Sequence, residues 1–560
     1  MTIRRLTPIA LCALLTLVGC ASPQVADDEP TTDEADAEPV HLRIIGANDF
    51  HGALEGPNGE VTVDGESVEA GGAAYLASHV DRLEEESEHT TFVVAGDLIG
   101  ASPLVSSLFF DEPTIEAFNA IGLDISSVGN HEFDRGVDEL MRIDEGGCHP
   151  DEGCREDHEY RGTDFDYLAA NVTYRATGEP IMPPYTIRNY DEATVGYIGM
   201  TLEKTPEVVV PSAIEDVEFH NEVETVEKYL PELEEEGVDT VIVVVHEGGA
   251  PTGEPGDIGD CADVEGDIVT MAEEMPDEVS VIVSGHTHLP YICEFGGKLV
   301  TQAAHSGQVL TAIDLHIDPA GGVVDRSAEQ HAVTPDIGAD DDIAALIDEY
   351  ATLAEPRAQR TVGTITDDLP RGPRRAAGES PIGRLIADAQ LEATTDEADA
   401  DVAFMNPGGI RDALDYDEET DGAVTYEQLH TIQPFANLLI TMTLTGDEIH
   451  DLLEQQWRED ARPHLLAVSS SFSYEWSADA EVGQRVDFDS IELHGQPLER
   501  DREYRVTVNN FLADGGDGFT ILTEGRDRVG GAVDLDVLAD YVERHSPIEP
   551  PEDVRAVEID

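Results

Sequence analysis

The chain has 560 residues, of which 40% are hydrophobic, and this length exceeds what one hydrophobic core organises, so it predicts two domains. Its formal net charge is -88, because 119 acidic residues stand against 31 basic ones. A chain with this charge repels nucleic-acid phosphates and anionic membrane surfaces, which argues against a protein that binds nucleic-acid polymers. The charge also predicts that stability and activity rise with salt concentration, although a well-solvated acidic surface is an equally good interpretation.

The first 40 residues have the pattern of an export signal followed by a tether. Two arginines precede an apolar run from Leu6 to Val18, which is too short to span a bilayer and typical of a signal peptide over residues 1–19. The run ends in Leu17-Val18-Gly19-Cys20, which resembles the lipobox of bacterial lipoproteins. The resemblance implies cleavage before Cys20 and a lipid on its sulfur, while an ordinary signal peptide with an incidental cysteine is the alternative. Residues 20–40 predict an acidic, disordered tether, so we expect an extracytoplasmic protein anchored to a membrane.

Four cysteines follow the tether, and none of them has the spacing of a zinc site or a CxxC motif: they are Cys148, Cys154, Cys261 and Cys293. Export to an oxidising compartment predicts two disulfides, with three connectivities open. A bond between Cys148 and Cys154 would close a small loop in a charged insert. A bond between Cys261 and Cys293 would tie a second insert near the candidate metal ligands.

The rest of the chain divides into two α/β domains and a connector. Residues 41–337 alternate apolar strands with helical stretches, which predicts βαβ units around a largely buried sheet. Residues 338–360 are the expected connector, whose amphipathic helix, Asp342–Leu353, is expected to end before Pro356. Residues 361–555 predict a second, smaller α/β domain. The expected helices are Ala73–Leu83, Val223–Glu235 and Pro381–Thr394, and the expected strands of the second domain are Val402–Met405 and Tyr504–Val508.

Five apolar, strand-like runs in the first domain are each followed at once by residues of metal-binding types. The runs are Leu42–Ala47, Phe92–Ala95, Ile125–Val128, Val241–Val245 and Val281–Val283. Open α/β sheets place their sites at the carboxyl ends of strands, so we expect the residues that follow these runs to meet there. The candidate ligands are Asp49, His51, Asp97, Asn130, His246, His286 and His288.

This ligand set predicts a dinuclear metal centre. Oxygen and nitrogen donors without a thiolate suit Zn²⁺, Mn²⁺, Co or Fe, and the two carboxylate oxygens of Asp97 could bridge two ions. Two cations about 3.5–4 Å apart would clamp a phosphoryl group and acidify the water that attacks it. A single aspartate after a strand is usually a turn former, and a single histidine is usually a hydrogen-bonded polar residue. The prediction therefore depends on the whole set and its order.

The order of these motifs resembles that of the calcineurin-like metallophosphoesterases, and the segments 47–52 and 129–134 resemble the 5′-nucleotidase / UDP-sugar hydrolase family. The resemblance implies an N-terminal four-layer α/β sandwich joined by the connector to the smaller domain. It implies that one ion is held by Asp49, His51, Asp97 and His288, and the other by Asp97, Asn130, His246 and His286. It also implies that His131 stabilises the transition state and that Asp134 orients His131. A cationic imidazole held by a carboxylate suits charge that develops on a phosphoryl group.

Three loops of the second domain predict a nucleotide site. The segment Asn406-Pro407-Gly408-Gly409-Ile410-Arg411 follows a strand and combines two glycines with a planar cation, which suits an anion. Phe435 and Phe511 lie beside turn-forming residues and could sandwich a base, although packing in a core is the commoner fate of phenylalanine. The family resemblance implies that these two rings stack on the base and that Asp517 contacts the ribose. It also implies that Asn406 and Arg411 bind the substrate and its phosphate.

The chain departs from the family pattern before the helix that starts near Pro381. Ala376 stands where the family has a substrate-contacting arginine, and Arg375 or Arg374 is the candidate replacement. Pro381 itself replaces a polar residue of the family motif. These changes bear on how the phosphate chain is recognised.

The sequence thus predicts a hydrolase with two divalent ions that releases phosphate from nucleoside 5′-phosphates, with di- and triphosphates or UDP-sugars as further substrates. Two alternatives stay open. One is a 2′,3′-cyclic-nucleotide phosphodiesterase/3′-nucleotidase, which shares the metal motifs. The other is a lipid-anchored nucleotide-binding protein without turnover, which has no need of His131 and Asp134. The oligomeric state is not predicted.

Overall fold

The computed structural model describes residues 39–150, 153–154, 160–209, 213–251, 256–261, 264–318, 322–372, 380–458 and 463–559. The expected signal peptide, Cys20 with most of the tether, and the arginine candidates Arg374 and Arg375 lie outside these residues. Within the described ranges, no helix combines the length and the apolar character that crossing a membrane requires.

The first domain contains two six-stranded sheets. The first sheet has the order β18 (Gly322–Ala332), β17 (Val309–Asp318), β1 (Val40–Ala47), β4 (Thr90–Ala95), β5 (Ile125–Ser127) and β6 (Asp166–Leu168). The second has the order β15 (Tyr291–Phe295), β16 (Lys298–Gln302), β14 (Val279–Ser284), β11 (Thr240–His246), β9 (Ala193–Thr201) and β8 (Tyr185–Tyr190). Strands β1, β4, β5 and β6 run parallel, as do β9, β11, β14 and β16, so their carboxyl ends share one edge in each sheet.

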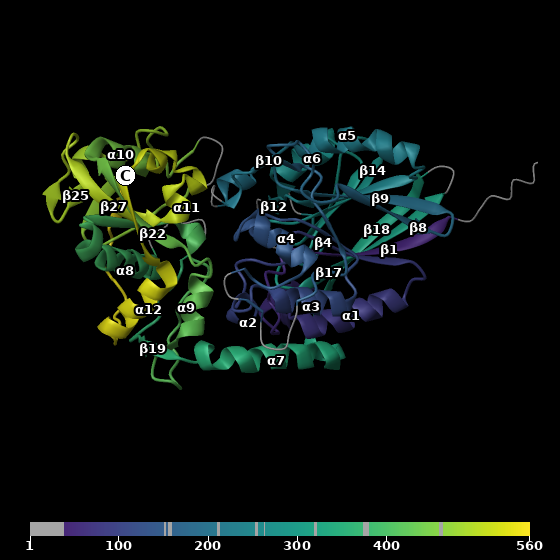
Figure 1. The fold of residues 1–560 in the computed structure, drawn as a ribbon, viewed down its shortest axis with the longest axis horizontal. Coiled ribbons are helices and arrows are strands. Elements are labelled where there is room, and N and C mark those ends of the chain that lie inside the picture. The colour runs from purple at the N-terminus through teal and green to yellow at the C-terminus, as the bar shows by residue number, and fades with distance from the viewer. Residues whose placement is uncertain are drawn as a thin grey trace, which may run out of the picture. The chain divides into compact units, whose positions relative to one another are not determined.

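The two sheets pack against each other, and helices cover their outer faces. In β11, Ile242 and Val244 join the apolar cluster between the sheets, while Val243 and its alternate neighbours pack on the helix side. This is the period of two that places successive side chains on opposite faces of a strand. Helices α1 (Ala73–Glu85), α3 (Glu112–Ile121) and α4 (Val137–Glu145) cover the first sheet, and α5 (Glu222–Glu235) and α6 (Asp267–Glu274) cover the second (Figure 1). The predicted four-layer α/β sandwich is confirmed.

The second domain is a smaller α/β unit, as predicted. Its central sheet has the order β23 (Ala467–Val468), β20 (Val402–Met405), β27 (Glu503–Asn509), β22 (Leu438–Thr445) and β28 (Arg526–Val533). One face packs against α8 (Pro381–Ala398), α9 (Tyr426–Ile432) and α12 (Asp534–His545). The other face packs against α10 (Gly446–Glu454) and a second sheet of β26 (Gln496–Pro497), β25 (Glu492–Leu493), β24 (Phe472–Trp476) and β29 (Ala556–Glu558).

Further short strands and α-helices lie between these elements. The paired strands are β2 (Gly59–Val63) with β3 (Glu66–Ala70), β7 (Val172–Tyr174) with β10 (Val217–Phe219), β12 (Ala250–Pro251) with β13 (Val264–Glu265), and β19 (Thr361–Thr364) with β21 (Ala423–Thr425). The short helices are α2 (Leu104–Ser107) and α11 (Asn510–Ala513). The disulfides Cys148–Cys154 and Cys261–Cys293 are formed, which selects one of the three connectivities that the sequence left open.

The connector is the helix α7 (Asp341–Ala358), and it continues past the point where we expected it to end. Its N-cap is Asp340, whose side chain accepts hydrogen bonds from the N–H groups of the next turn. The helix contains Pro356, so the prediction that it stops before this proline is wrong. The final turn persists because Ala354 and Ala358 are buried, and tertiary packing outweighs the hydrogen bond that the proline lacks.

Helix α7 contributes to the apolar clusters of both domains. Ile343, Ile347 and Tyr350 pack in the cluster under the first sheet, while Ala358 packs in the cluster of the second domain. Hydrogen bonds repeat this division, because Tyr350 donates to Glu116 of α3 and Arg357 donates to Tyr426 of α9. The connector is therefore a structural part of both domains.

Candidate active site

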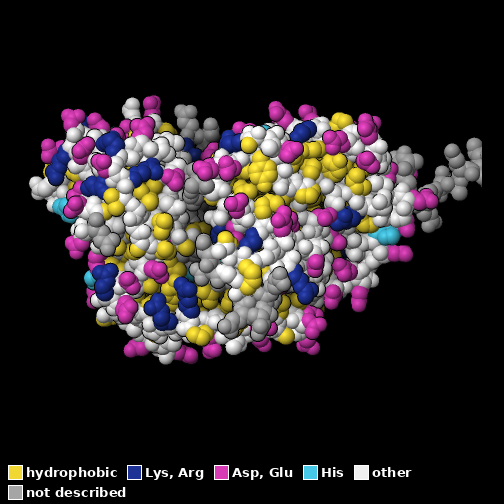
Figure 2. All heavy atoms as spheres, viewed as in Figure 1, with side chains coloured by type: hydrophobic (Ala, Val, Ile, Leu, Met, Phe, Trp, Pro, Cys, Tyr) yellow, Lys and Arg dark blue, Asp and Glu magenta, His cyan; other side chains and the backbone are white. Residues whose placement is uncertain are grey.

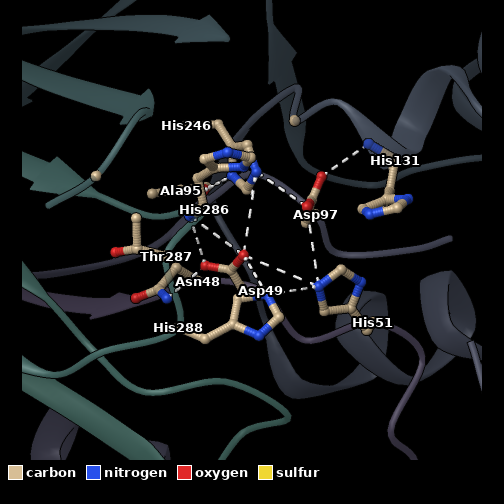
Figure 3. A network of polar contacts seen from close by, with 12 residues as sticks. Asn48, Asp49, His51, Ala95, Asp97, His131, His246, His286, Thr287 and His288 are labelled. Carbon is tan, nitrogen blue, oxygen red and sulfur yellow. Dashed lines mark hydrogen bonds and ion pairs between the residues drawn. The ribbon is translucent and has the colours of Figure 1, made fainter. Parts of the chain in front are cut away.

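The five strand ends predicted to carry metal ligands meet at one place in the first domain (Figure 3). The loops after β1, β4 and β5 approach it from the first sheet, and the last residue of β11 and the loop after β14 approach it from the second. Gly129, two residues after the end of β5, lies against Asp97 so closely that a Cβ there would overlap the backbone and carboxylate of Asp97. The two sheets together bring Asp49 and His288, which are far apart in the sequence, into contact.

Six of the seven candidate ligands form two clusters, each with ligand atoms within 4.8 Å of one another: Asp49, His51 and His288 in one, and Asp97, His246 and His286 in the other. Asp97 lies between the clusters, because its Oδ2 is 2.9 Å from Nε2 of His246 and 3.8 Å from Nε2 of His51. Asp49 Oδ1 is 3.1 Å from Nε2 of His288. This arrangement suits two adjacent cations that share a carboxylate.

The backbone at these ligands adopts the left-handed conformation that side chains other than glycine rarely take. The residues with positive φ are Asp49 (50°), His51 (51°), Asp97 (50°), His286 (73°) and His288 (62°). Each such residue costs on the order of 1 kcal/mol or more, and strain of this kind concentrates at functional sites. The sequence carries no signal for it, because aspartate and histidine are ordinary residues in many turns.

Backbone carbonyls orient two of the imidazoles. Nδ1 of His51 is 2.9 Å from the carbonyl oxygen of Gly100, and Nδ1 of His246 is 2.8 Å from that of Ala95. A carbonyl oxygen only accepts, so each Nδ1 carries a proton and each Nε2 faces the cluster. Both rings are therefore held in the orientation in which Nε2 could bind a cation.

Two residues that the sequence reasoning passed over support the ligand loops. The buried carboxylate of Glu132 accepts hydrogen bonds from the backbone N–H groups of Asp97, Leu98 and Gly129, so it ties the loop after β4 to the loop after β5. Asn48 donates to Asp49 Oδ2 at 2.6 Å and to the carbonyl oxygen of Ala304 at 2.7 Å. Asn48 precedes the ligand Asp49 and Glu132 lies two residues after Asn130, but only the folded loops show what these side chains hold in place.

The donor set fits divalent cations. Burial lowers the pKa of His246, but the carboxylates of Asp97 and Asp49 outweigh this effect and raise it to about 10. Burial lowers the pKa of His286 to about 4, and His246 adds to the effect. Two fully buried carboxylates thus demand positive charge at this point. In addition, Oδ1 of the buried Asn130 has no hydrogen-bond partner in the described structure, which leaves this oxygen available to a cation.

His131 and Asp134 form the expected pair at the edge of the clusters. Nδ1 of His131 is 2.8 Å from Oδ2 of Asp134, and the His131 backbone N–H donates to Asp97 Oδ1. Burial lowers the pKa of His131, but the carboxylates of Asp134 and Asp97 outweigh burial and raise it. The ring of His131 also lies parallel to that of Phe435, with centroids 5.6 Å apart and an interplanar angle of 10°. His131 is therefore favoured in its cationic form.

A cavity of about 720 Å³ joins this pair to the expected substrate residues. From the metal side its lining includes Asn130, His131, Asp134 and His286, and from the second domain it includes Asn406, Gly408, Gly409, Arg411, Phe435, Phe511 and Asp517. Its volume is that of a typical small-molecule site. The structure thus brings together all described residues that the sequence assigned to catalysis and substrate binding.

Hydrogen bonds and close packing order the second-domain side of the cavity. Asn406 Nδ2 donates to Asp517 Oδ2 at 2.8 Å, and Asn509 Nδ2 donates to Asn406 Oδ1 at 3.0 Å. The Phe511 ring lies directly against Gly516, where an added Cβ would overlap it. The guanidinium of Arg411 is 5.7 Å from the centre of the Phe435 ring. Polar groups and aromatic faces therefore alternate along this wall.

A four-layer sandwich with two histidine–carboxylate clusters at its strand ends defines the class of metallophosphoesterases. Comparison with family models agrees: residues 42–290 match the calcineurin-like phosphoesterases, and residues 361–524 match the 5′-nucleotidase C-terminal domain.

Known proteins are similar to the chain over most of its length. "Endonuclease YhcR" of Bacillus subtilis is 34% identical over 91% of this chain, which spans 40% of that protein. "Cell wall protein Lmo0130" of Listeria monocytogenes is 30% identical over 92% of this chain and 68% of its own length. The crystal structure of a 5′-nucleotidase precursor from Thermus thermophilus is 27% identical, with a TM-score of 0.75 over 93% of this chain and 99% of that one. The chain belongs to the 5′-nucleotidase family of phosphoric monoester hydrolases.

Proposed function

We propose that this protein is an extracytoplasmic, metal-dependent 5′-nucleotidase that releases phosphate from nucleoside 5′-monophosphates. The observation that carries the proposal is one cavity in which the His131–Asp134 pair and two candidate metal ligands, Asn130 and His286, face Asn406, Arg411 and two phenylalanines. A general phosphatase has no need of aromatic faces and a buried amide–carboxylate pair on the wall opposite its catalytic residues. A nucleoside attached to the reacting phosphate would use both.

In this proposal, the first cluster with Asp97 and the second cluster with Asn130 would each hold one divalent ion. Bound ions would neutralise phosphoryl charge and lower the pKa of the attacking water. His131, kept cationic by Asp134, would direct its Nε2–H toward the negative charge that develops on the phosphoryl oxygens. Asp97 would fix the main chain at His131 by accepting the hydrogen bond from its backbone N–H.

The second domain would bind the nucleoside. Phe435 and Phe511 would stack on the base, which is worth about 1–3 kcal/mol per base. Asp517, oriented by Asn406, would accept a hydrogen bond from a ribose hydroxyl, and Arg411 would contact phosphate oxygens through its planar fork. Arg375 or Arg374 would add a further phosphate contact. Recognition of the sugar and base would thus position the phosphate for attack.

The test is phosphate release from AMP by residues 40–560 with Mn²⁺, Zn²⁺ or Co²⁺, compared with 3′-AMP and 2′,3′-cyclic AMP. We expect metal-dependent release from AMP that EDTA abolishes, and none from the Asp97→Ala variant. Turnover of the 3′ and cyclic substrates alone would replace the proposal with the phosphodiesterase/3′-nucleotidase alternative. Tight adenosine binding without hydrolysis under any metal would favour the non-catalytic alternative.

One finding favours testing phosphodiesters as a second candidate class: the Bacillus subtilis relative is named an endonuclease. The net charge of -88 weighs against a polymeric nucleic acid as substrate, because the surface repels its phosphates. A short dinucleotide and single-stranded DNA, added at low and high salt, separate these cases. Cleavage of the DNA at a rate similar to that for AMP would contradict the restriction to nucleotides.

We further propose that the protein is anchored outside the cytoplasm by a lipid on Cys20. The lipobox-like Leu17-Val18-Gly19-Cys20 supports this, and the Listeria relative is named a cell wall protein. Incorporation of radioactive palmitate into the full chain, lost in the Cys20→Ser variant, is the expected result. Release of unlabelled protein into the medium would favour the ordinary signal peptide.

A further inference from the structure

A buried acid, which has no part in the proposed chemistry, forms hydrogen bonds with both ends of the loop that carries Phe435. The loop runs from Gln433 to Asn437, between α9 and β22, and Ala436 within it has a positive φ of 51°. Asp534, the first residue of α12, lies beneath it with 2% of its surface exposed. The loop is therefore held at both ends by contacts from one side chain and its backbone.

The contacts of Asp534 reach each end of the loop. At the first end, Gln433 Nε2 donates to Asp534 Oδ2 at 3.4 Å. At the other end, the Asp534 backbone N–H donates to the Asn437 carbonyl oxygen at 2.8 Å, and the side-chain amide and backbone N–H of Asn437 face the carboxylate. Asp534 Oδ1 also accepts from the Leu535 N–H at 2.8 Å. Phe435 stands in the middle of the segment that these bonds close.

Burial of this carboxylate is costly, which makes its presence informative. None of the ion pairs among the described residues includes Asp534, and the groups that face it are uncharged amides and N–H groups. Burial accordingly raises the pKa of Asp534 to about 7. An acid in the first turn of a helix is common, because the helix dipole favours negative charge there. An exposed acid interacts with the dipole equally well, and Asp536 in the same turn is such an acid. The helix dipole therefore does not explain why Asp534 is buried.

We propose that Asp534 is a positioning residue for nucleobase binding: it fixes both ends of the Gln433–Asn437 loop and so holds the Phe435 ring at the wall of the cavity. This inference rests on the proposed function for the identity of the base as ligand. Asp534 itself touches neither the cavity nor the reacting atoms. Its loss is expected to weaken contact with the base and to leave phosphoryl transfer intact.

The test compares Asp534→Ala with Asp536→Ala, a matched variant that removes an acid from the same helical turn. Steady-state kinetics are measured with AMP and with glycerol phosphate, which has no base to stack. For Asp534→Ala we expect the KM for AMP to rise at least about fivefold, the lower end of what stacking of one base contributes, with kcat nearly unchanged. Neither parameter for glycerol phosphate is expected to change, and Asp536→Ala should behave as the unmodified protein.

A second measurement separates this inference from the proposed function. Adenosine binding by calorimetry needs no turnover, and its Kd should rise in Asp534→Ala even if AMP proves not to be a substrate. Asp534→Asn keeps one acceptor oxygen, so we expect an intermediate rise, and this variant replaces Asp534→Ala if the alanine variant does not fold. Equal adenosine affinity in these variants, no adenosine binding at all, or an equal loss with glycerol phosphate would overturn the positioning role.

Discussion

At the scale of single residues, Asp97 and His131 are expected to have different roles: Asp97 binds the cations, and His131 stabilises the charge that develops on the phosphoryl group. We expect His131→Ala to lower kcat by about 10²–10⁴-fold, the range for loss of one acid–base or charge-stabilising group, with its bound metal retained. Asp97→Ala should lose both activity and metal, because this carboxylate lies between the two clusters. Metal content measured by atomic emission alongside kcat checks both. Loss of metal from His131→Ala would contradict the division of roles.

The contact of the Phe511 ring with Gly516 gives a test of stacking that leaves the ring in place. Phe511→Ala is expected to raise the KM for AMP by about five- to 150-fold if stacking is worth about 1–3 kcal/mol. Gly516→Ala keeps the ring but displaces it, because a Cβ there would overlap it. We expect the second variant to raise KM in the same direction. Activity on glycerol phosphate is the control, and an equal loss on both substrates would refute the stacking role.

The buried acid Asp534 also predicts a pH dependence of stability. Its pKa is about 7 in the folded protein against 3.8 for the ordinary group, so the folded state favours the protonated form. The stability it contributes is complete below about pH 4 and is lost as the pH rises to about 7, by up to about 4 kcal/mol. The Asp534→Asn variant has no carboxyl group to ionise at this position, so it does not lose this stability as the pH rises. The melting temperature of the variant relative to the unmodified protein should therefore rise from pH 4.5 to pH 7 and then level off.

The exposed Asp536 provides the comparison for that titration, because Asp536→Asn removes the same charge without changing a buried carboxylate. A relative melting temperature that is flat between pH 4.5 and pH 8 in the Asp534 variant would contradict the buried-acid explanation.

At the scale of elements, the strand ends were predictable because two independent signals coincide there. Each apolar run has the β-branched composition of a buried strand, and each is followed by residues that bind metals. The structure extends four of the five predicted runs by two or three residues in all, as in β4 (Thr90–Ala95) against the expected Phe92–Ala95, since flanking threonines fit the pleat equally well, and it ends β5 at Ser127, one residue before the expected Val128. Which strands pair, and that two sheets rather than one contribute ligands, depends on long-range packing that no local pattern records.

Other features of the site were beyond the sequence for the same reason. The positive φ angles at Asp49 and His286 arise because surrounding structure enforces them. The links that Glu132 makes exist only once the loops after β4 and β5 are adjacent. The stacking of Phe435 on His131 joins residues from different domains. The metal-binding and catalytic residues were thus predictable from residue types and their order. The residues that support them and the strained backbone angles at the ligands became visible only in the folded chain.

Helix α7 continues through Pro356, where the sequence predicted that it would end, and this leads to a prediction about the stability of the connector. Pro356 is exposed within the last turn and leaves that turn one hydrogen bond short. Pro356→Ala restores the N–H, and we expect it to stabilise the protein by about 1–2 kcal/mol after the entropy that proline removes from the unfolded chain is subtracted. Glu355→Ala is the control for helix propensity alone. A melting temperature that falls in Pro356→Ala would show that the proline sets the geometry of this turn.

At the scale of the whole molecule, charge is the dominant feature. Acidic side chains are spread over the visible face, with basic ones in smaller groups between them (Figure 2). With a net charge of -88, self-repulsion is strong at low salt, and the screening length falls from about 10 Å at 0.1 M to about 3 Å at 1 M. We expect the melting temperature and AMP hydrolysis to rise with KCl well beyond physiological concentrations.

Sucrose at matched osmolality is the control for that salt series, because it strengthens burial without screening charge. A melting temperature that does not change with KCl would favour the other interpretation of the composition, in which the acidic surface is simply well hydrated.

Helix α7 packs in the apolar clusters of both domains, and this determines where the chain can be joined to a relative's chain in a chimeric protein. A crossover placed before residue 341 would separate Ile343, Ile347 and Tyr350 from the apolar residues of the first domain that they cover. A crossover after residue 358 keeps those contacts and disturbs chiefly Ala358 and the hydrogen bond from Arg357 to Tyr426. Exchange of substrate specificity between family members should therefore succeed when the helix travels with the metal domain, and the modular unit is longer than the catalytic fold alone.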